Sequence, residues 1–208
     1  MKKSKRIKKS NSWKIKQHRD QFFKKSKTLG YRSRASFKLI ELNKKYKFLK
    51  KNTNLLDLGS YPGGWSQVAS QIIKVGRIMS IDIKNMEPIK NVQFFKGDIL
   101  SEETKSVVIR YFKSNLDVIL SDMAADTTGN KSLDSIRTNQ LCADVINFSK
   151  ETLKPKGVLV SKIFMGEDFL EVKNLAKSTF NKVNFFKPKS SRKESKETYL
   201  HCEILKTL

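Results

Sequence analysis

A glycine-rich turn is the first stretch of the sequence with a recognisable chemical use. It runs from Gly59 to Gly64, directly after a short apolar segment, and a helical pattern begins after it. Glycines in such a place let backbone amides at a helix N-terminus approach a ligand closely. The Gly-Lys-Ser/Thr ending of a P-loop is missing, and the spacing is not the GxGxxG of a dinucleotide fold. A purely structural turn fits these glycines about equally well.

Two later aspartates strengthen the case for a ligand. Asp82 ends the second apolar segment, 23 residues after Gly59, where nucleotide-binding α/β folds place an acid against ribose hydroxyls. Asp98 follows the third such segment and is placed to meet a purine edge. With the turn, they indicate a nucleoside-containing cofactor without a pyrophosphate. Asp57 is expected to brace the turn instead. The competing interpretation is that Asp82 and Asp98 are ordinary loop acids at strand ends.

The charge of the chain is concentrated at one end. The formal net charge is +23, and residues 1–50 hold 19 Lys and Arg against 2 Asp and Glu. A basic excess confined to one region predicts a surface for a polyanion, since each neutralised phosphate releases counterions. A lysine-rich coding bias is the alternative, but it does not explain the uneven distribution. The basic run at residues 2–9 could bind phosphate or be only a solvated tail.

Length and composition exclude several classes of protein. The 208 residues suit one domain, which we expect at residues 13–208 with an N-terminal basic helical segment, after a disordered basic tail at 1–12. Two cysteines and two histidines without CxxC spacing argue against a disulfide scaffold or a zinc site, so no metal is expected. No secretory signal and no run of about 18 apolar residues is present. The expected protein is soluble, cytoplasmic, not membrane-bound and monomeric.

The hydrophobic pattern alternates between short strands and helices. Strands are predicted at residues 54–58, 77–83, 92–96, 116–121, 157–163, 183–186 and 198–205. Helices are predicted at 36–51, 65–75, 102–112, from the middle of the chain to about 153, and at 168–177, with a basic loop at 187–196. This order predicts an α/β fold whose mostly parallel sheet carries helices on both faces. Ligands of such sheets bind at the carboxyl ends of the strands.

Residues 57–67, DLGSYPGGWSQ, resemble the S-adenosylmethionine loop DLGAAPGGWSQ of the FtsJ-type RNA ribose 2′-O-methyltransferases. Four further segments resemble that family in the same order: YRSRASFKL at 31–39, SDMA at 121–124, KIF at 162–164, and a series at 187–199. The likeness covers roughly residues 31–200. It departs at Ser60-Tyr61, where the family has Ala-Ala, and at Ala125-Asp126, where it has Pro-Asn.

The resemblance implies a Rossmann-like S-adenosylmethionine-dependent methyltransferase fold with a seven-stranded sheet. It also implies a catalytic tetrad, which falls on Lys38, Asp122, Lys162 and Glu197. The contacts to S-adenosylmethionine that it carries over fall on Gly63, Trp65, Asp82, Asp98 and Asp122.

Each member of the tetrad is given a role by the reaction. A ribose hydroxyl is a poor nucleophile at neutral pH, so the site must align it with the methyl carbon and help it lose its proton. Lys162 is expected nearest the hydroxyl, either as a neutral base or as a charged group that stabilises the developing alkoxide. Lys38 supplies a neighbouring positive charge. Asp122 orients Lys162 and faces the sulfonium, and Glu197 holds Lys38 or the hydroxyl network.

The candidates for RNA binding come from two basic segments. They are Arg32 and Arg34 in the first, and Lys187, Lys189, Arg192 and Lys193 in the second. Arg and Lys there are expected to hold phosphates without reading sequence. Tyr31 or Trp13 could stack on a base, or pack locally.

The expected activity is 2′-O-methylation of the ribose of a uridine in large-subunit ribosomal RNA. This modification is expected to support ribosome assembly. The expected partner is ribosomal RNA within the large subunit. A tRNA ribose methyltransferase of the same fold is one alternative. A non-catalytic RNA-binding assembly factor is the other, and the complete tetrad argues against it.

Overall fold

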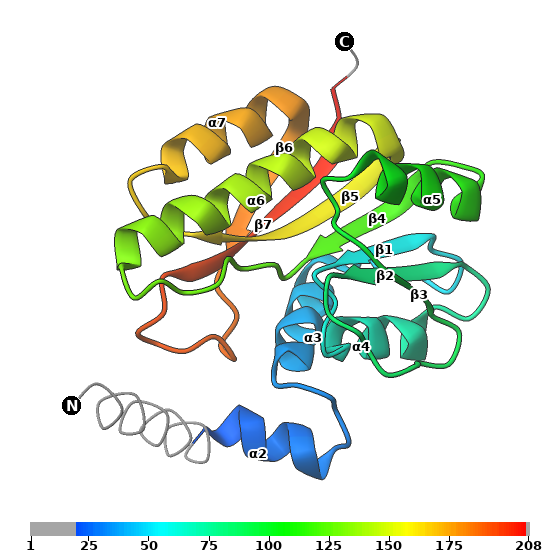
Figure 1. Ribbon diagram of the computed structural model, residues 1–208, viewed down its shortest axis with the longest axis horizontal. Coiled ribbons are helices and arrows are strands. Elements are labelled where there is room, and N and C mark those ends of the chain that lie inside the picture. The colour runs from blue at the N-terminus through cyan, green and yellow to red at the C-terminus, as the bar shows by residue number, and fades with distance from the viewer. Residues whose placement is uncertain (1–19, 207–208) are drawn as a thin grey trace.

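A computed structural model describes residues 20–206 (Figure 1). The tail expected at residues 1–12 and the candidate Trp13 lie outside the described residues. Within residues 20–206 no helix is long and apolar enough to cross a bilayer.

One sheet of seven strands runs through the described part of the chain, in the order β3-β2-β1-β4-β5-β7-β6. All neighbouring strands pair in parallel except β7, which is antiparallel to both β5 and β6. This mostly parallel sheet confirms the predicted fold class. The strands are β1 (Leu55–Leu58), β2 (Ile78–Asp82), β3 (Gln93–Lys96), β4 (Leu116–Ser121), β5 (Leu153–Phe164), β6 (Phe180–Phe186) and β7 (Glu197–Leu205).

Helices cover both faces of the sheet and create two apolar cores (Figure 1). One face carries α5 (Glu102–Phe112), α6 (Lys131–Thr152) and α7 (Phe169–Thr179). The other carries α3 (Ala35–Tyr46) and α4 (Gly64–Ile72). Strand residues alternate between the cores, as Leu159 and Val160 do, because successive side chains of a strand point to opposite faces.

Two predicted boundaries differ clearly from the structure. The helix expected to reach residue 51 ends at Tyr46, where Lys47 takes a left-handed conformation with φ of 55° and its N–H bonds to Asn43. The strand expected from residue 157 begins at Leu153, and the register with β4 shifts between Leu116 and Val118. Such an irregularity tolerates Pro155, which sequence alone places in a break between two elements.

A short helix, α2 (Gln21–Thr28), precedes the sheet and agrees with the expected basic helical segment. Asp20 caps it, since its carboxylate accepts from the N–H groups of Phe22 and Phe23. Phe22 packs against Phe37 of α3, with ring centroids 5.5 Å apart. Helix α2 is therefore packed against α3, the helix that follows it in the chain.

Candidate active site

The four residues of the expected tetrad meet at the carboxyl ends of the central strands. Lys162 Nζ lies 2.9 Å from Asp122 Oδ1, and Lys38 Nζ lies 2.8 Å from Glu197 Oε2. The two remaining ammonium–carboxylate distances, Lys38 to Asp122 and Lys162 to Glu197, are both 3.9 Å. Two cations and two anions thus alternate in one cluster, although the residues are up to 159 positions apart.

Strands β5 and β7 place Lys162 and Glu197 on the same face. Lys162 is opposite Tyr199 in the antiparallel ladder, and Glu197 is opposite Phe164. Residues directly opposite each other share a face, and so do residues two apart on one strand. Lys162 therefore continues the row of Val160, which belongs to the core under α3.

Lys38 and Asp122 reach the cluster from a helix and a strand end. Lys38 is buried on α3, whose Leu39 and Leu42 pack against the sheet. Asp122 directly follows β4, and its backbone oxygen also accepts from Lys162 Nζ at 2.7 Å. That second contact fixes the lysine against the strand end as well as against the carboxylate.

The cluster favours the charged forms of its members. Burial acts to raise the pKa of Asp122, but Lys162, Lys38 and the Tyr199 hydroxyl outweigh it and hold that pKa below its ordinary value. Burial acts to lower the pKa of Lys162, and Asp122 and Glu197 outweigh it, so this pKa lies above its ordinary value. Of the two roles open for Lys162, the geometry favours the protonated stabiliser over the neutral base.

Two hydroxyl groups complete the cluster. Tyr199 donates to Asp122 Oδ1 at 2.6 Å, and burial followed by the charge of Asp122 raises the Tyr199 pKa well above 10.0. Ser191 donates to Glu197 Oε1 at 2.7 Å. Both residues belong to segments that resemble the family, but their residue types gave no sign that they touch the tetrad.

A cleft of about 680 Å³ lies beside the cluster at the same edge of the sheet. Asp82, Asp98 and Asp122 line it, as expected for cofactor contacts. The Asp82 carboxylate accepts from the N–H groups of Tyr61 and Lys84, both at 2.8 Å, which fixes the turns after β1 and β2. Two carboxylates at neighbouring strand ends are suited to hydroxyl and amino donors of a nucleoside.

Glycine is required where the cleft meets the tetrad. Gly59 has φ of +69°, and a Cβ atom there would overlap the side chain of Met123, which follows Asp122. The turn and the loop after β4 therefore touch through backbone at this point. That close approach brings the wall of the cleft next to Asp122.

Gly63 and Trp65 are placed differently from the three aspartates. Neither lines the cleft. The Trp65 side chain is 2% exposed, lies in the core under α3, and donates from Nε1 to the Ala35 oxygen at 2.8 Å. Its indole thus joins α4 to α3, so a contact with a cofactor has to come from backbone at the start of α4.

Asp57 braces the turn from below. Its carboxyl group is buried and accepts from the hydroxyl of Ser66 on α4, which also bonds to Ser80 of β2 at 2.6 Å. The other oxygen, Oδ1, has no hydrogen-bond partner among the described residues. Burial, with Asp122 and Asp82 nearby, raises the pKa of Asp57 to about 7, against the opposing effect of Ser66.

The two departures from the family's pattern leave the cleft open. Tyr61 is 52% exposed at its rim, and Lys84 lies over its ring at 5.8 Å from the centroid. Ala125 donates its N–H to Thr138 of α6, and the Asp126 oxygen accepts from Arg137. Helix α6 thereby holds the loop behind Asp122 in place of the family's Pro-Asn.

Three of the basic RNA-binding candidates are engaged within the protein. Arg32 donates to the backbone oxygens of Glu87 and Pro88, both at 2.6 Å. Arg34 pairs with Asp20 and donates to the Ser190 oxygen, and burial lowers the Arg34 pKa. Lys187 donates to the Ser195 oxygen at 2.6 Å. Tyr31 packs locally, edge-on to Phe37 at 5.6 Å.

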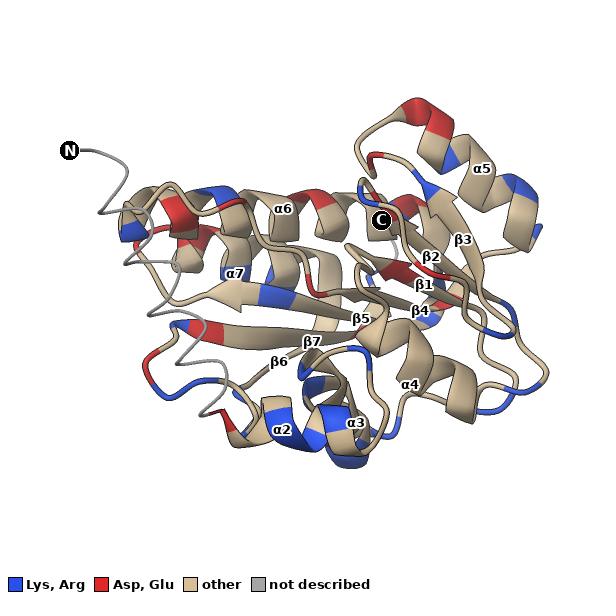
Figure 2. Ribbon diagram, turned by 60° about the horizontal axis from the view of Figure 1, so that its bottom comes forward, with Lys and Arg blue, Asp and Glu red and all other residues tan. Residues whose placement is uncertain are grey.

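The remaining candidates lie on the 187–196 loop. Lys189 and Lys193 are exposed, and Arg192 is 40% exposed with Nε 3.6 Å from Asp20. This loop lies beside α2 and α3, and Lys and Arg residues of all three segments are on the same side of the ribbon (Figure 2). The arrangement gives a basic surface next to the cluster, and the two acids of residues 1–50, Asp20 and Glu41, both face the loop.

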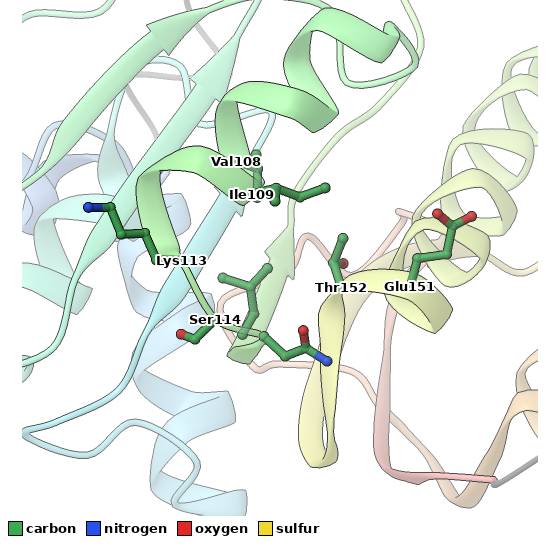
Figure 3. Close-up of a pocket in the computed structure, with 8 residues that line it drawn as sticks. Val108, Ile109, Lys113, Ser114, Glu151 and Thr152 are labelled. Atoms are coloured by element: carbon green, nitrogen blue, oxygen red, sulfur yellow. The ribbon is translucent and has the colours of Figure 1, made fainter.

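A second pocket, of about 260 Å³, is unrelated to this site (Figure 3). It lies between the C-terminal ends of α5 and α6, and Leu116, the first residue of β4, lines it. Asp122 follows the other end of that six-residue strand, about 20 Å away. The pocket is therefore at the opposite edge of the sheet.

Helix α6 supplies cleft residues that the sequence reading missed. Arg137, Gln140, Leu141 and Asp144 line the wall facing the turn. Their spacing of three, four and seven residues places them on one face of a helix, which is a signal available from the sequence. The apolar residues that predict this helix do not by themselves indicate that these four residues line a cleft.

Comparison with known proteins gives a family match over most of the chain. A family model described as FtsJ-like methyltransferase matches residues 31–204. A ribosomal RNA large subunit methyltransferase E from Pelagibacter ubique is 47% identical over 197 residues, covering 95% of this chain and 97% of that protein. The protein of the same description from Rickettsia canadensis is 41% identical over 202 residues, covering 94% and 89%.

Two solved structures share the fold. A ribosomal RNA methyltransferase, described as putative, from Plasmodium falciparum has a TM-score of 0.76 at 36% identity, covering 84% of this chain and 98% of that one. A putative methyltransferase from Streptococcus mutans, in complex with SAH, has a TM-score of 0.51 at 15% identity, covering 83% and 96%. The second likeness concerns the fold alone.

Proposed function

The chain belongs to the FtsJ-like methyltransferase family, and on that basis we propose that it methylates a ribose 2′-oxygen of large-subunit ribosomal RNA, using S-adenosylmethionine. The observation that carries the proposal is the alternating cluster of Lys38, Asp122, Lys162 and Glu197 beside a cleft suited to a nucleoside. The relatives described as acting on large-subunit ribosomal RNA support the substrate class.

The residues of the cleft fit S-adenosylmethionine. Asp82 and Asp98 offer carboxylates for hydroxyl and amino donors, and Gly59 keeps the wall next to Met123 free of a side chain. Asp122 carries negative charge at the junction of cleft and cluster, where a sulfonium is favoured. When bound, S-adenosylmethionine supplies an electrophilic methyl group. We assign Trp65 to it through its backbone N–H at the start of α4. We assign Gly63, whose own N–H bonds to the Ser60 oxygen at 2.6 Å, through the left-handed turn that leads into that helix.

The protein's share of the reaction is to hold the ribose oxygen and stabilise its developing charge. Lys162 stays protonated and donates to the 2′-oxygen, and Asp122 fixes the direction of its ammonium group. Lys38, held by Glu197, adds a second positive charge. As the oxygen gains its bond to carbon, its proton passes to solvent water, and alignment supplies much of the rate.

The substrate enters over the basic side of the molecule. We propose that Lys189, Arg192 and Lys193 of the 187–196 loop hold phosphates of the bound RNA, because the two lysines are exposed and Arg192 is 40% exposed. We retain Arg32, Arg34 and Lys187 as residues that shape this surface from within. A uridine as the target, and a role in ribosome assembly, belong to the same proposal.

Methyl transfer to defined RNA tests the function. Purified protein and radiolabelled S-adenosylmethionine are incubated with large ribosomal subunits, with free ribosomal RNA and with tRNA, all from cells lacking the corresponding methyltransferase. We expect incorporation into large-subunit RNA, at a nucleotide whose adjacent phosphodiester bond then resists alkaline hydrolysis. Incorporation into tRNA alone would favour the tRNA enzyme, and none into any RNA would favour the non-catalytic assembly factor.

A further inference from the structure

We propose that Ser191 is a positioning residue for the reaction, acting by holding the Glu197 carboxylate in place against Lys38. The inference rests on the proposed function, because it concerns the same cluster. It assigns part of the 187–196 loop to the chemistry, whereas sequence analysis predicted only contacts with RNA for that loop.

The Glu197 carboxylate is fixed through both of its oxygens. Oε2 is 2.8 Å from Lys38 Nζ, and Oε1 accepts from the Ser191 hydroxyl at 2.7 Å. Ser191 and Glu197 are both buried. Ser191 makes the hydrogen bond recorded for Oε1, although the Tyr199 hydroxyl also lies close to this carboxylate. Without the Ser191 hydroxyl the carboxylate is freer to rotate away from Lys38 and towards Lys162, which is now 3.9 Å away.

Helix α3 determines where Ser191 lies. The Glu41 carboxylate accepts from the backbone N–H groups of Lys189 at 2.6 Å and Ser190 at 3.0 Å. A turn follows, in which the Ser191 N–H bonds to the Pro188 oxygen at 3.0 Å. Glu41 lies one turn after Lys38 on the same helix. One helix therefore carries both the lysine and the clamp for the loop that holds its carboxylate.

The neighbouring Ser190 provides a matched control. Its side chain is 0% exposed, and its hydroxyl has no hydrogen-bond partner among the described residues. Its backbone N–H and oxygen make the contacts with Glu41 and Arg34 that hold the loop, and alanine keeps both. Ser190→Ala and Ser191→Ala thus remove the same group from adjacent buried positions, and only the second removes a bond to Glu197.

The test measures steady-state methyl transfer by the full chain with large ribosomal subunits. Ser191→Ala is expected to lower kcat about 10-fold, the typical effect of losing a hydrogen bond to a charged group. KM for S-adenosylmethionine and for the subunits should stay within about twofold of wild type. Ser190→Ala should leave kcat within about twofold. Thermal melting of each variant checks that it is folded.

A double variant tests whether Ser191 acts through Glu197. If it does, adding Ser191→Ala to Glu197→Ala should lower single-turnover transfer by less than about twofold, because the group it positions is gone. Equal kcat for wild type and Ser191→Ala, equal losses in the two serine variants, or a full 10-fold further loss in the double variant would each overturn the proposal. A wild-type protein inactive on every RNA would refute the proposed function itself, before any variant is compared.

Discussion

The cleft and the tetrad cluster share one edge of the sheet but are built in different ways. Most residues that line the cleft come from the ends of β1 to β4 and the turns after them, within residues 59–126, and α6 supplies the rest. The cluster joins Lys38 of α3 to Glu197 of β7 across most of the chain. A cleft made locally leaves a readable spacing of glycines and acids, whereas a cluster made by distant residues leaves none.

The two regions also treat a buried carboxyl group in opposite ways. Asp57, next to the turn, has no cationic partner within residues 20–206, and burial raises its pKa to about 7. Asp122, one strand away, has two ammonium groups and keeps its pKa below the ordinary value despite burial. The cleft side therefore tolerates a carboxyl that is partly neutral, while the cluster depends on charge.

The largest expected effect separates the regions directly. Lys162→Ala should lower methyl transfer at least about 1,000-fold, because it removes the cation that stabilises the developing alkoxide. The Kd for S-adenosylmethionine should change less than about threefold, as titration calorimetry would measure. Lys156→Ala, an exposed change on the same strand, is the control. Loss of cofactor binding instead would assign Lys162 to the cleft.

The second effect concerns stability and belongs to the cleft side. Between about pH 4 and 7 folded Asp57 binds a proton that the unfolded chain has released, so the free energy of unfolding falls as pH rises. The loss attributable to this group is about 4 kcal/mol and is complete above about pH 7. Urea denaturation from pH 4 to 8 should show that decline in wild type relative to Asp57→Asn. Parallel pH profiles would contradict the raised pKa.

A third effect should be confined to cofactor affinity. Asp82→Ala removes a carboxylate from the cleft and the bonds that fix two turns, so the Kd for S-adenosylmethionine should rise about 10- to 100-fold. Binding of ribosomal RNA, followed by filter retention, should be unchanged. Glu87→Ala, an exposed acid after the same strand, serves as the control. Weaker RNA binding in Asp82→Ala, but not in the control, would show that the cleft also contributes to binding RNA.

The smallest effect distinguishes two kinds of basic residue. Replacing Lys189 and Lys193 together by alanine should weaken RNA binding several-fold and reduce its salt slope by about one per lost contact. Arg32→Ala should leave that slope unchanged and raise the Kd for the cofactor a few-fold, because its guanidinium holds the loop after β2. A reduced salt slope in Arg32→Ala would show instead that Arg32 contacts RNA phosphate.

The sequence alone predicted the architecture and two aspartates of the cleft, for a physical reason. Alternating apolar segments report the sheet, and Asp82 and Asp98 stand at strand ends that a parallel sheet must bring to one edge. The tetrad was identified only through resemblance, since 43 Lys and Arg give no local reason to choose Lys38 or Lys162.

What sequence reading could not supply is how charges are paired. Arg34 looks like a phosphate ligand in the sequence, yet it bonds to Asp20 and to the 187–196 loop. Glu41 looks like an isolated acid on a basic helix, yet it clamps that loop. The bonds of Arg34 and Glu41 to that loop join segments about 150 residues apart and depend on the folded chain.

The reversed direction of β7 has a practical consequence for labelling and immobilising this protein. Glu197 starts the strand at the catalytic edge, so its last residue, Leu205, emerges about 25 Å away beside the start of β6. A fluorophore or surface tether joined beyond that point would face away from an incoming ribosomal particle. Immobilised binding assays can therefore be anchored there without shielding the reactive side.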